Sequence, residues 1–355
     1  MRVHVVGAGP VGSVASICAL RENHEVSLYE EHSRAGIPVN CSGLISKEGL
    51  ESLKEFVDYK KHTVSRIRGA VIDCAGSQLL VDSGRDIAYV INRASFDQAL
   101  ADKAESEGAT LHYGKRAAPP FSDGHIIGAD GPNSSVAAHF NFPKIERFVG
   151  VSQTTIKYSE PLSDHVRIFI SNQKYPGFFA WLIPQNKDYV EAGAGCVLPG
   201  NPNNALDALA KEVGIEFPKE RTHSIIPVAQ RARTSYFSSR RNVLLVGDAA
   251  GQVKSTTGGG VVFGTKCAKI AAKNIGTPKH YEREWRTAYG KDLDTHSHLH
   301  LTLGALSDEA ISAFGSIAST FKIEDFLQRS GNMDAPTKMF GADLLLHPLR
   351  SLVNK

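Results

Sequence analysis

Val6-Gly7-Ala8-Gly9-Pro10-Val11-Gly12 follows an apolar run that begins at Val3. Small and apolar residues then predict a helix over 11–20, and a second apolar run predicts a strand over 26–29. A strand, a G-x-G-x-x-G turn and a helix form a nucleotide-binding unit, because the glycines allow a tight turn, close approach of a phosphate and packing of the helix on the strand. The residues predicted to hold the phosphates are Gly7, Gly9, Pro10 and Gly12.

Further positions outside this turn fit the same nucleotide. Glu30 ends the second predicted strand, close to the distance of about 20 residues at which an acid binds the ribose hydroxyls. Asp130 and Gly131 form an Asp-Gly turn after a short apolar run at 126–127. Arg93 begins a predicted helix over 93–107 and could reach a pyrophosphate or the edge of a ring. We therefore expect Glu30, Arg93, Asp130 and Gly131 to contact the cofactor.

A second glycine-acid turn lies far along the chain, after the apolar run 243–246. The carboxylate of Asp248 can accept hydrogen bonds from a polyol chain. Three successive glycines then open a predicted helix over 260–275, leaving room for a flat ring at a helix end that favours negative charge. Two such sites so far apart predict a long nucleotide that spans both, as FAD does. The second set is Gly247, Asp248, Gly258, Gly259 and Gly260.

The composition is that of an ordinary soluble protein. The 355 residues are 42% hydrophobic and 22% charged, enough for one large core or two joined domains. A net charge of +3 gives no reason to expect nucleic acid as a partner. The five cysteines are scattered, which suits a reducing cytoplasm and predicts neither disulfides nor a zinc site. We find no apolar run near the roughly 18 residues of a membrane helix and no room for a signal peptide, so we expect a cytoplasmic protein.

These elements predict an α/β (α+β) fold with a Rossmann-like FAD-binding domain, an inserted, mostly antiparallel sheet and a helical C-terminus. Residues 63–91 and 147–198 alternate apolar and polar side chains as antiparallel strands do, and 46–57 reads as a helix. The predicted domains are an FAD-binding domain of 1–62, 92–140 and 240–295, a substrate domain of 63–91 and 141–239, and a helical region of 296–355.

The order of these pieces resembles the FAD-binding layout of the p-hydroxybenzoate hydroxylase fold. Two other segments narrow the resemblance. Residues 38–43, Pro-Val-Asn-Cys-Ser-Gly, resemble the cysteine-x-glycine site of the geranylgeranyl reductase family. Residues 176–184 are similar to that family's P-x-x-Y-x-W-x-F-P motif, with Phe179 in place of its tyrosine and Ile183 in place of its phenylalanine.

The resemblance implies an FAD-dependent oxidoreductase, similar to digeranylgeranylglycerophospholipid reductases, that saturates C=C bonds of geranylgeranyl chains in membrane ether lipids. Reduced flavin would supply the hydride, while the protein places the alkene, excludes water and protonates the second carbon. Cys41 and Gly43 are the implied catalytic positions, and Cys41 would also contact the flavin. The implied apolar wall for the chain is Phe179, Trp181 and Ile183. An inert cysteine and an ordinary core strand are the simpler alternatives.

Two other functions fit parts of the sequence. Residues 179–184 are also close to the W-x-W-x-I-P motif of flavin halogenases, so a monooxygenase or halogenase of the same fold is one alternative, although the Cys-Ser-Gly at 41–43 favours a reductase. Prenyl-binding escort proteins, which are not enzymes, use a related fold, but the intact Glu30, Asp130 and Asp248 argue against that alternative. The external reductant is left open among NADPH, NADH and ferredoxin.

The C-terminal region carries two patterns. His296, His298 and His300 alternate, and we interpret them as part of a solvated helix rather than a metal site, because no nearby acid completes a ligand set. Residues 344–355 are apolar with basic residues between. This composition is compatible with peripheral contact with a membrane, which would suit an isoprenoid lipid substrate, and equally with ordinary helix packing.

Overall fold

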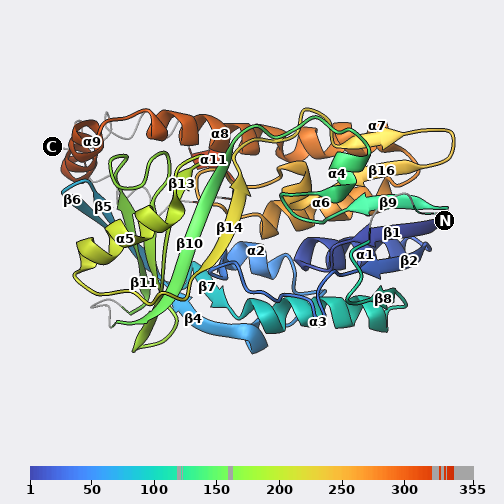
Figure 1. Cartoon of the computed structure of the whole chain (residues 1–355), viewed down its shortest axis with the longest axis horizontal. Helices are drawn as coiled ribbons and strands as arrows, with labels where there is room; N and C mark the ends of the chain where they lie inside the picture. The colour runs from blue at the N-terminus through green and yellow to red at the C-terminus, as the bar shows by residue number, and fades with distance from the viewer. Residues whose placement is uncertain are drawn as a thin grey trace.

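The computed structural model describes residues 1–117, 121, 123–158, 163–321, 328, 332 and 334–339. Two halves, each built on a sheet, lie side by side, and helices run along one edge of both (Figure 1). The half with the N-terminus contains a six-stranded sheet, and the other half contains a seven-stranded sheet. The predicted α/β (α+β) class is confirmed.

The six-stranded sheet is the Rossmann-like part. Its strands, in sheet order, are β15 (Ser235–Phe237), β16 (Asn242–Leu245), β9 (His125–Gly128), β1 (Arg2–Val6), β2 (Glu25–Tyr29) and β8 (Thr110–His112). All neighbours are parallel except β15 and β16. Val3 and Val5 bury one face under α1 (Pro10–Arg21), α3 (Arg93–Ser106) and α6 (Val261–Lys273). Ile126 and Leu245 bury the other face under α4 (Ser135–His139).

The seven-stranded sheet is mostly antiparallel. Its strands, in sheet order, are β14 (Thr222–Pro227), β10 (Phe148–Lys157), β13 (Tyr189–Val197), β12 (Ala180–Pro184), β11 (His165–Ile170), β5 (Gly69–Cys74) and β6 (Ser77–Asp82). Only β11 and β5 pair in parallel. Apolar residues alternate along these strands, so one face packs on α5 (Pro202–Val213) and the other, the inner face, packs toward the first half.

A small sheet lies against the inner face, and its strands are β3 (Leu44–Ser46), β7 (Ala88–Ile91) and β4 (Thr63–Ile67). Ile67 and Val90 of this sheet share an apolar cluster with Trp181 and Val149 of the inner face. The small sheet and the inner face therefore pack on one another through apolar side chains.

The helices along the edge connect the halves. The remaining helical elements are α2 (Lys47–Glu51), η1 (Tyr59–His62), η2 (Gly247–Ala250), α7 (Pro278–Trp285), η3 (Arg286–Gly290), α8 (Lys291–Gly304), α9 (Asp308–Thr320) and α11 (Pro336–Met339). Gly304 at the end of α8 reaches the second half, because a Cβ there would lie 3.3 Å from the Cα of Gly177. Packing of α9 on β6 is closer still, since a Cβ on Gly315 would lie 2.1 Å from the Oγ of Ser77.

The helix predicted over 46–57 is much shorter in the structure. Only α2 forms, and turns follow it to residue 56. Leu53, Phe56 and Val57 are all buried, and a continued helix would point the adjacent side chains of Phe56 and Val57 about 100° apart. No helix within the described residues is long and apolar enough to cross a membrane. The predicted membrane contact of 344–355 lies outside the described residues.

Candidate active site

The loop between β1 and α1 is shaped by two glycines and left open by a third. Gly7 has a φ of +98°, which residues with a Cβ rarely adopt. A Cβ on Gly12 would lie 1.8 Å from the carbonyl oxygen of Gly7, so α1 packs directly on the turn. A Cβ on Gly9, by contrast, would meet no atom within 4 Å. Gly9 therefore leaves an open cradle at the N-terminus of α1, as a bound phosphate requires.

Glu30, at the end of β2, is fixed beside this loop. Its buried carboxylate accepts a hydrogen bond from the backbone N–H of Ala8 at 3.0 Å and another from that of His32 at 3.1 Å. The Nδ1 atom of His32 lies 2.7 Å from the same carboxylate. The acid thus stands next to the glycine loop, while its predicted contact with a ribose stays a prediction.

The turn at Gly247 and Asp248 lies directly against the N-terminal glycine turn of residues 7–12. A Cβ on Gly247 would lie 3.2 Å from the side chain of Val11 in α1. A Cβ on Gly264 in α6 would lie 2.6 Å from Cγ2 of Val11 and 3.1 Å from the Cα of Gly247. Two helices that belong to opposite ends of the chain therefore pack closely enough to bring both turns into one site, which suits a single long nucleotide.

Buried charged groups lie beside this junction. Arg93 makes two hydrogen bonds to Asp97, at 2.8 and 2.7 Å, and its guanidinium lies within hydrogen-bonding reach of Cys41. Burial lowers the pKa of Arg93, but Asp97 and Cys41 outweigh burial and the pKa is raised. Burial raises the pKa of Asp248 to about 6, although the charge of Arg93 opposes this rise. Three predicted site residues, Cys41, Arg93 and Asp248, are therefore brought together.

Of three other predicted positions, the fold itself explains the contacts of Gly43 and Asp130, whereas Gly131 is left open. Gly43 has a φ of +74°, and a Cβ there would lie 2.1 Å from the carbonyl oxygen of Ile91, so the pairing of β3 with β7 requires glycine. The carboxylate of Asp130 binds the start of α4, where it accepts hydrogen bonds from Ser134, Ser135 and Val136. Gly131 has a φ of +76° and an open side. Catalytic or cofactor contacts at these positions stay predictions.

The glycine triplet connects the nucleotide half to the inner face. A Cβ on Gly260 would lie 2.5 Å from Oδ1 of Asp248. A Cβ on Gly258 would lie 2.6 Å from Cδ1 of Ile226 and 3.8 Å from Cζ of Phe178, both in the seven-stranded half. The glycine triplet of residues 258–260, which is predicted to face a flat ring, therefore lies next to the inner face.

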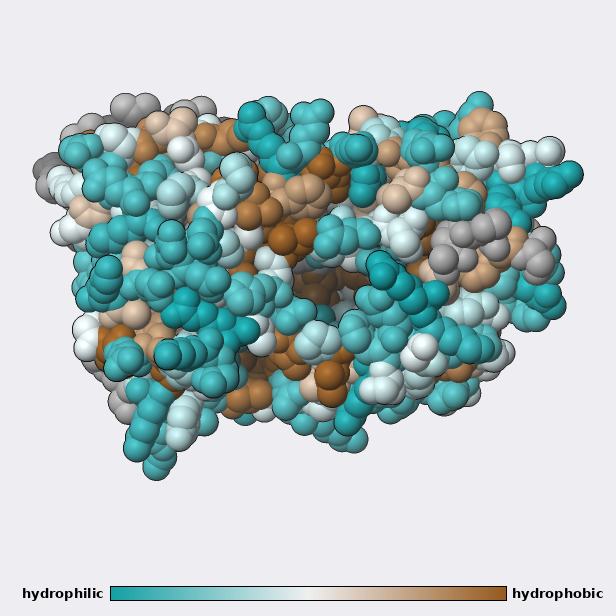
Figure 2. Space-filling model, in the orientation of Figure 1, coloured by the Kyte–Doolittle hydropathy of each residue, from teal (hydrophilic) through white to brown (hydrophobic). Residues whose placement is uncertain are grey.

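A row of aromatic rings continues from the glycine triplet along β12. The ring centroids of Phe178 and Phe179 are 4.3 Å apart, and those of Phe179 and Trp181 are 5.5 Å apart. Trp181 lies on Gly193 of β13, where a Cβ would be 2.2 Å from the indole. Ile183 is buried in the same cluster. The surface view shows a hollow with apolar residues around it between the two halves (Figure 2). The predicted wall thus lies on the inner face.

The fold and sequence are similar to those of prenyl reductases. No family model matches the chain. The digeranylgeranylglycerophospholipid reductase of Methanosarcina mazei is 27% identical over 339 residues, which are 82% of this chain and 82% of that protein. The crystal structure of a geranylgeranyl bacteriochlorophyll reductase-like protein from Thermoplasma acidophilum matches with a TM-score of 0.75 and 18% identity, covering 99% of this chain and 98% of the other. The chain is therefore similar in sequence and in fold to members of the geranylgeranyl reductase family. The chain is an FAD-dependent oxidoreductase.

Two further relatives come from one organism, Methanocaldococcus jannaschii. An uncharacterized protein is 27% identical over 387 residues, covering 99% of this chain and 95% of that protein. The digeranylgeranylglycerophospholipid reductase is 24% identical over 353 residues, covering 88% of each. Only one of these two relatives is named for a phospholipid.

Helix α8 contacts the loop that leads into the glycine triplet. His296 is fully buried, and its Nδ1 lies 2.6 Å from Oγ1 of Thr256. His300 is 6% exposed and packs near Phe178. The predicted solvated helix is therefore wrong for His296 and His300, although His298 is exposed. His296 and His300 are four residues apart and therefore lie on one helix face. This spacing could have predicted that both are buried. The described part of the chain contains no group of three or more potential metal ligands.

Sequence reasoning missed a long-range ion pair at the same loop. The side chain of Lys254 crosses Gly259, where a Cβ would lie 2.7 Å from its Cε. Its Nζ lies 2.7 Å from Asp334, which also accepts a hydrogen bond from Ser46. The two charges are 12% and 6% exposed. Because the partners lie 80 residues apart and no local pattern links them, only the tertiary structure identifies this pair.

The largely apolar inner face also carries the carboxyl group of Glu191, which the sequence did not predict as a site residue. Nε1 of Trp181 donates a hydrogen bond to Oε1 of Glu191 at 3.2 Å. Glu191 lies two residues before Gly193 on β13, so it shares the face that carries Trp181. Burial raises its pKa from the usual 4.5 to about 7, against the lowering effect of the Trp181 hydrogen bond. The side chain is only half-buried, so it lines an accessible space. A single acid within an otherwise small and apolar strand was the available signal.

The raised pKa of Glu191 predicts a pH-dependent stability. The folded state binds this proton more tightly than the unfolded state, so the free energy of unfolding falls as pH rises from about 4.5 to about 7. We compare the free energy of unfolding of Glu191→Gln with that of the native protein at each pH. We expect this difference to favour the variant more at pH 8 than at pH 5, by as much as about 3 kcal/mol. Urea unfolding of both proteins at each pH measures this, with the exposed Glu25→Gln as control. A Glu191→Gln effect that is equal at both pH values would contradict the assignment.

Proposed function

We propose that the protein is an FAD-dependent reductase that saturates C=C bonds of isoprenoid lipid chains. The observation that carries this proposal is the aromatic row of Phe178, Phe179 and Trp181, which begins at the glycine triplet and follows the inner face. An isolated alkene offers no charge to bind, so apolar contact must supply the affinity. Each buried CH₂ contributes about 0.8 kcal/mol, which makes a long prenyl chain a good ligand for such a wall.

The two adjoining turns fit FAD. The open cradle at Gly9 would hold the pyrophosphate, with Glu30 beside it for the ribose. Asp248 and the glycine triplet would hold the flavin end, where the N-terminus of α6 favours negative charge. Bound FAD, once reduced, supplies a hydride.

The chain's own residues would place the alkene, exclude water and provide a proton. Trp181 and Ile183 keep water from the apolar face. Cys41 donates the proton to the carbon that does not receive the hydride. The guanidinium of Arg93 lies within hydrogen-bonding reach of this sulfur, and solvent then returns the proton. The electron donor, whether NADPH, NADH or ferredoxin, reduces the cofactor in a separate step.

An anaerobic half-reaction tests this function. The purified flavoprotein is reduced with dithionite, mixed with a geranylgeranyl lipid, and followed by flavin absorbance together with the mass of the lipid. We expect the flavin to reoxidise and the chain to gain two hydrogens for each double bond reduced. We expect Cys41→Ser to slow reoxidation by about 10²-fold or more, as loss of a general acid does.

Cys18→Ser, a change at a cysteine on α1 that has no proposed role in the chemistry, is the matched control and should leave the rate unchanged. A flavin that stays reduced until oxygen is admitted, with an unchanged lipid, would contradict the reductase and favour a monooxygenase. Equal rates in Cys41→Ser and the native protein would exclude Cys41 as the proton donor. They would leave the proposed reductase activity standing.

A further inference from the structure

The inner face of the seven-stranded sheet is divided into an apolar part and a polar part. Strand pairing places Val149 opposite Val197 and Val151 opposite Gly195, next to the aromatic row. Further along the same strands, Gln153 lies opposite Gly193 and Thr155 lies opposite Glu191. Because alternate residues share a face, Gln153, Thr155 and Glu191 all lie on the side that carries Trp181. The apolar part adjoins the glycine triplet, and the polar part lies beyond Trp181.

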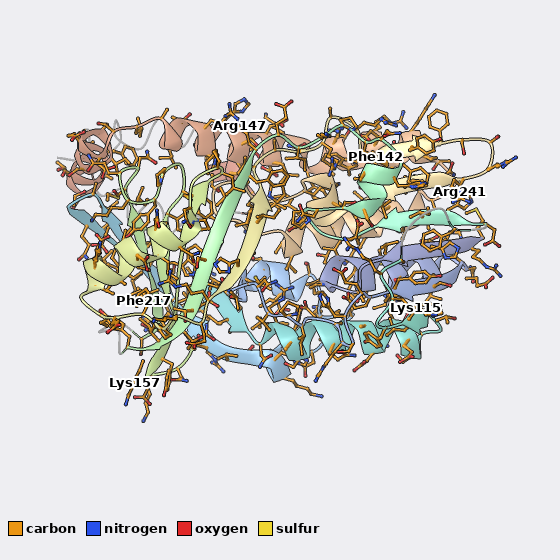
Figure 3. The ribbon with its side chains drawn as sticks, viewed as in Figure 1. Lys115, Phe142, Arg147, Lys157, Phe217 and Arg241 are labelled. Atoms are coloured by element: carbon orange, nitrogen blue, oxygen red, sulfur yellow. The ribbon has the colours of Figure 1, made fainter. Side chains whose placement is uncertain are left out.

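Glu191 is the ionisable group at the boundary between these parts. Its carboxyl accepts the Trp181 N–H at 3.2 Å and lies across from Ile183 on β12. Gln153, which is 5% exposed, brings a buried amide to the neighbouring strand position. The cation on the same strand as Gln153 is Lys157, which is exposed and lies at the outer tip of β10 (Figure 3). Among the described residues that strand pairing places at this boundary, Glu191 is the acid, Gln153 carries a neutral amide and Thr155 carries a hydroxyl. The lysine lies beyond them in solvent.

We propose that Glu191 and Gln153 form the subsite for the polar end of the isoprenoid substrate, and that this end is an uncharged hydroxyl group rather than a phosphate. This inference rests on the proposed function. A hydroxyl group can donate to the carboxyl oxygen of Glu191 and accept from the amide of Gln153, which satisfies all three groups. A phosphate would face a like charge at a half-buried position, where water screens it poorly. The hydroxyl end then lies beyond Trp181, and the double bonds extend along the aromatic row toward the glycine triplet.

The substrate preference of the dithionite-reduced holoenzyme tests this subsite. The rate of flavin reoxidation is measured at pH 8 with geranylgeraniol and with geranylgeranyl phosphate, each below saturation and in the same detergent. We expect the native protein to favour the alcohol at least tenfold. Glu191→Gln should abolish most of this preference, chiefly by accelerating reduction of the phosphate. Glu25→Gln, which changes charge equally but lies exposed at the start of β2 in the other sheet, should keep the native ratio.

A second variant covers the case in which Glu191→Gln folds poorly. Gln153→Leu removes the amide without changing charge, and we expect slower reduction of the alcohol with little change for the phosphate. A native preference for the phosphate, or a ratio that neither variant changes, would overturn the subsite while leaving the reductase intact. Reduction of neither chain, nor of the geranylgeranyl lipid used above, would overturn the proposed function itself, and the subsite with it.

Discussion

Replacing Gly9 by alanine is expected to leave the protein folded and to weaken FAD binding about 100-fold. The folded chain tolerates the new methyl group, because a Cβ there meets no atom within 4 Å and the φ of −65° is ordinary for alanine. The cradle does not tolerate it, since the methyl group occupies the space through which a pyrophosphate reaches the N–H groups of α1. Poorer packing and a lost charge-assisted hydrogen bond together cost about 3 kcal/mol, which corresponds to about 100-fold in affinity.

Two other glycines provide the controls for this experiment. Apoprotein is titrated with FAD by fluorescence quenching, and folding is followed by circular dichroism. Gly276→Ala, whose Cβ would only touch Met1 at 3.8 Å, should bind FAD normally. Gly12→Ala should lose the fold as well as the cofactor, because its Cβ would lie 1.8 Å from the carbonyl oxygen of Gly7. Native affinity in Gly9→Ala would show that no phosphate occupies the cradle.

Arg93→Met is expected to destabilise the protein by about 3–5 kcal/mol, the usual cost of leaving one buried charge without its partner. Arg93 and Asp97 are 14% and 4% exposed and are joined by two hydrogen bonds. Removing the arginine leaves Asp97 buried and takes away the positive charge beside Cys41 and Asp248. Urea unfolding in the absence of FAD measures the loss without any contribution from the cofactor.

The same helix offers a matched surface pair. Lys103 on α3 and Glu107, the residue directly after α3, are also four residues apart, but they are 41% and 21% exposed. Lys103→Met should therefore cost less than about 1 kcal/mol. The double variant Arg93→Met with Asp97→Leu should recover most of the lost stability, since a buried ion pair is often replaceable by apolar groups. It should not recover proton donation at Cys41. A loss in Arg93→Met no larger than that in Lys103→Met would contradict the assigned role of the pair.

Local backbone chemistry explains what could be predicted from the sequence. The turn at Gly7 needs a positive φ, α1 needs a glycine at position 12, and Asp248 follows a buried strand, so neighbouring residues alone identify these positions. Alternation along β12 similarly predicts that Phe179, Trp181 and Ile183 share a face, because strand geometry has a period of two. The fold class follows from the order of such elements.

The sequence by itself therefore determined the α/β fold, the two glycine-acid turns and the apolar wall, since each depends on sterics within a few residues. Only the tertiary structure decided that α6 packs on α1 to join the turns, that His296 is buried against Thr256, and that Glu191 meets Trp181. These contacts join segments that are distant in sequence or lie on neighbouring strands. Their partners are set by how the sheets and helices pack, and packing is a property of the whole chain that no local pattern encodes.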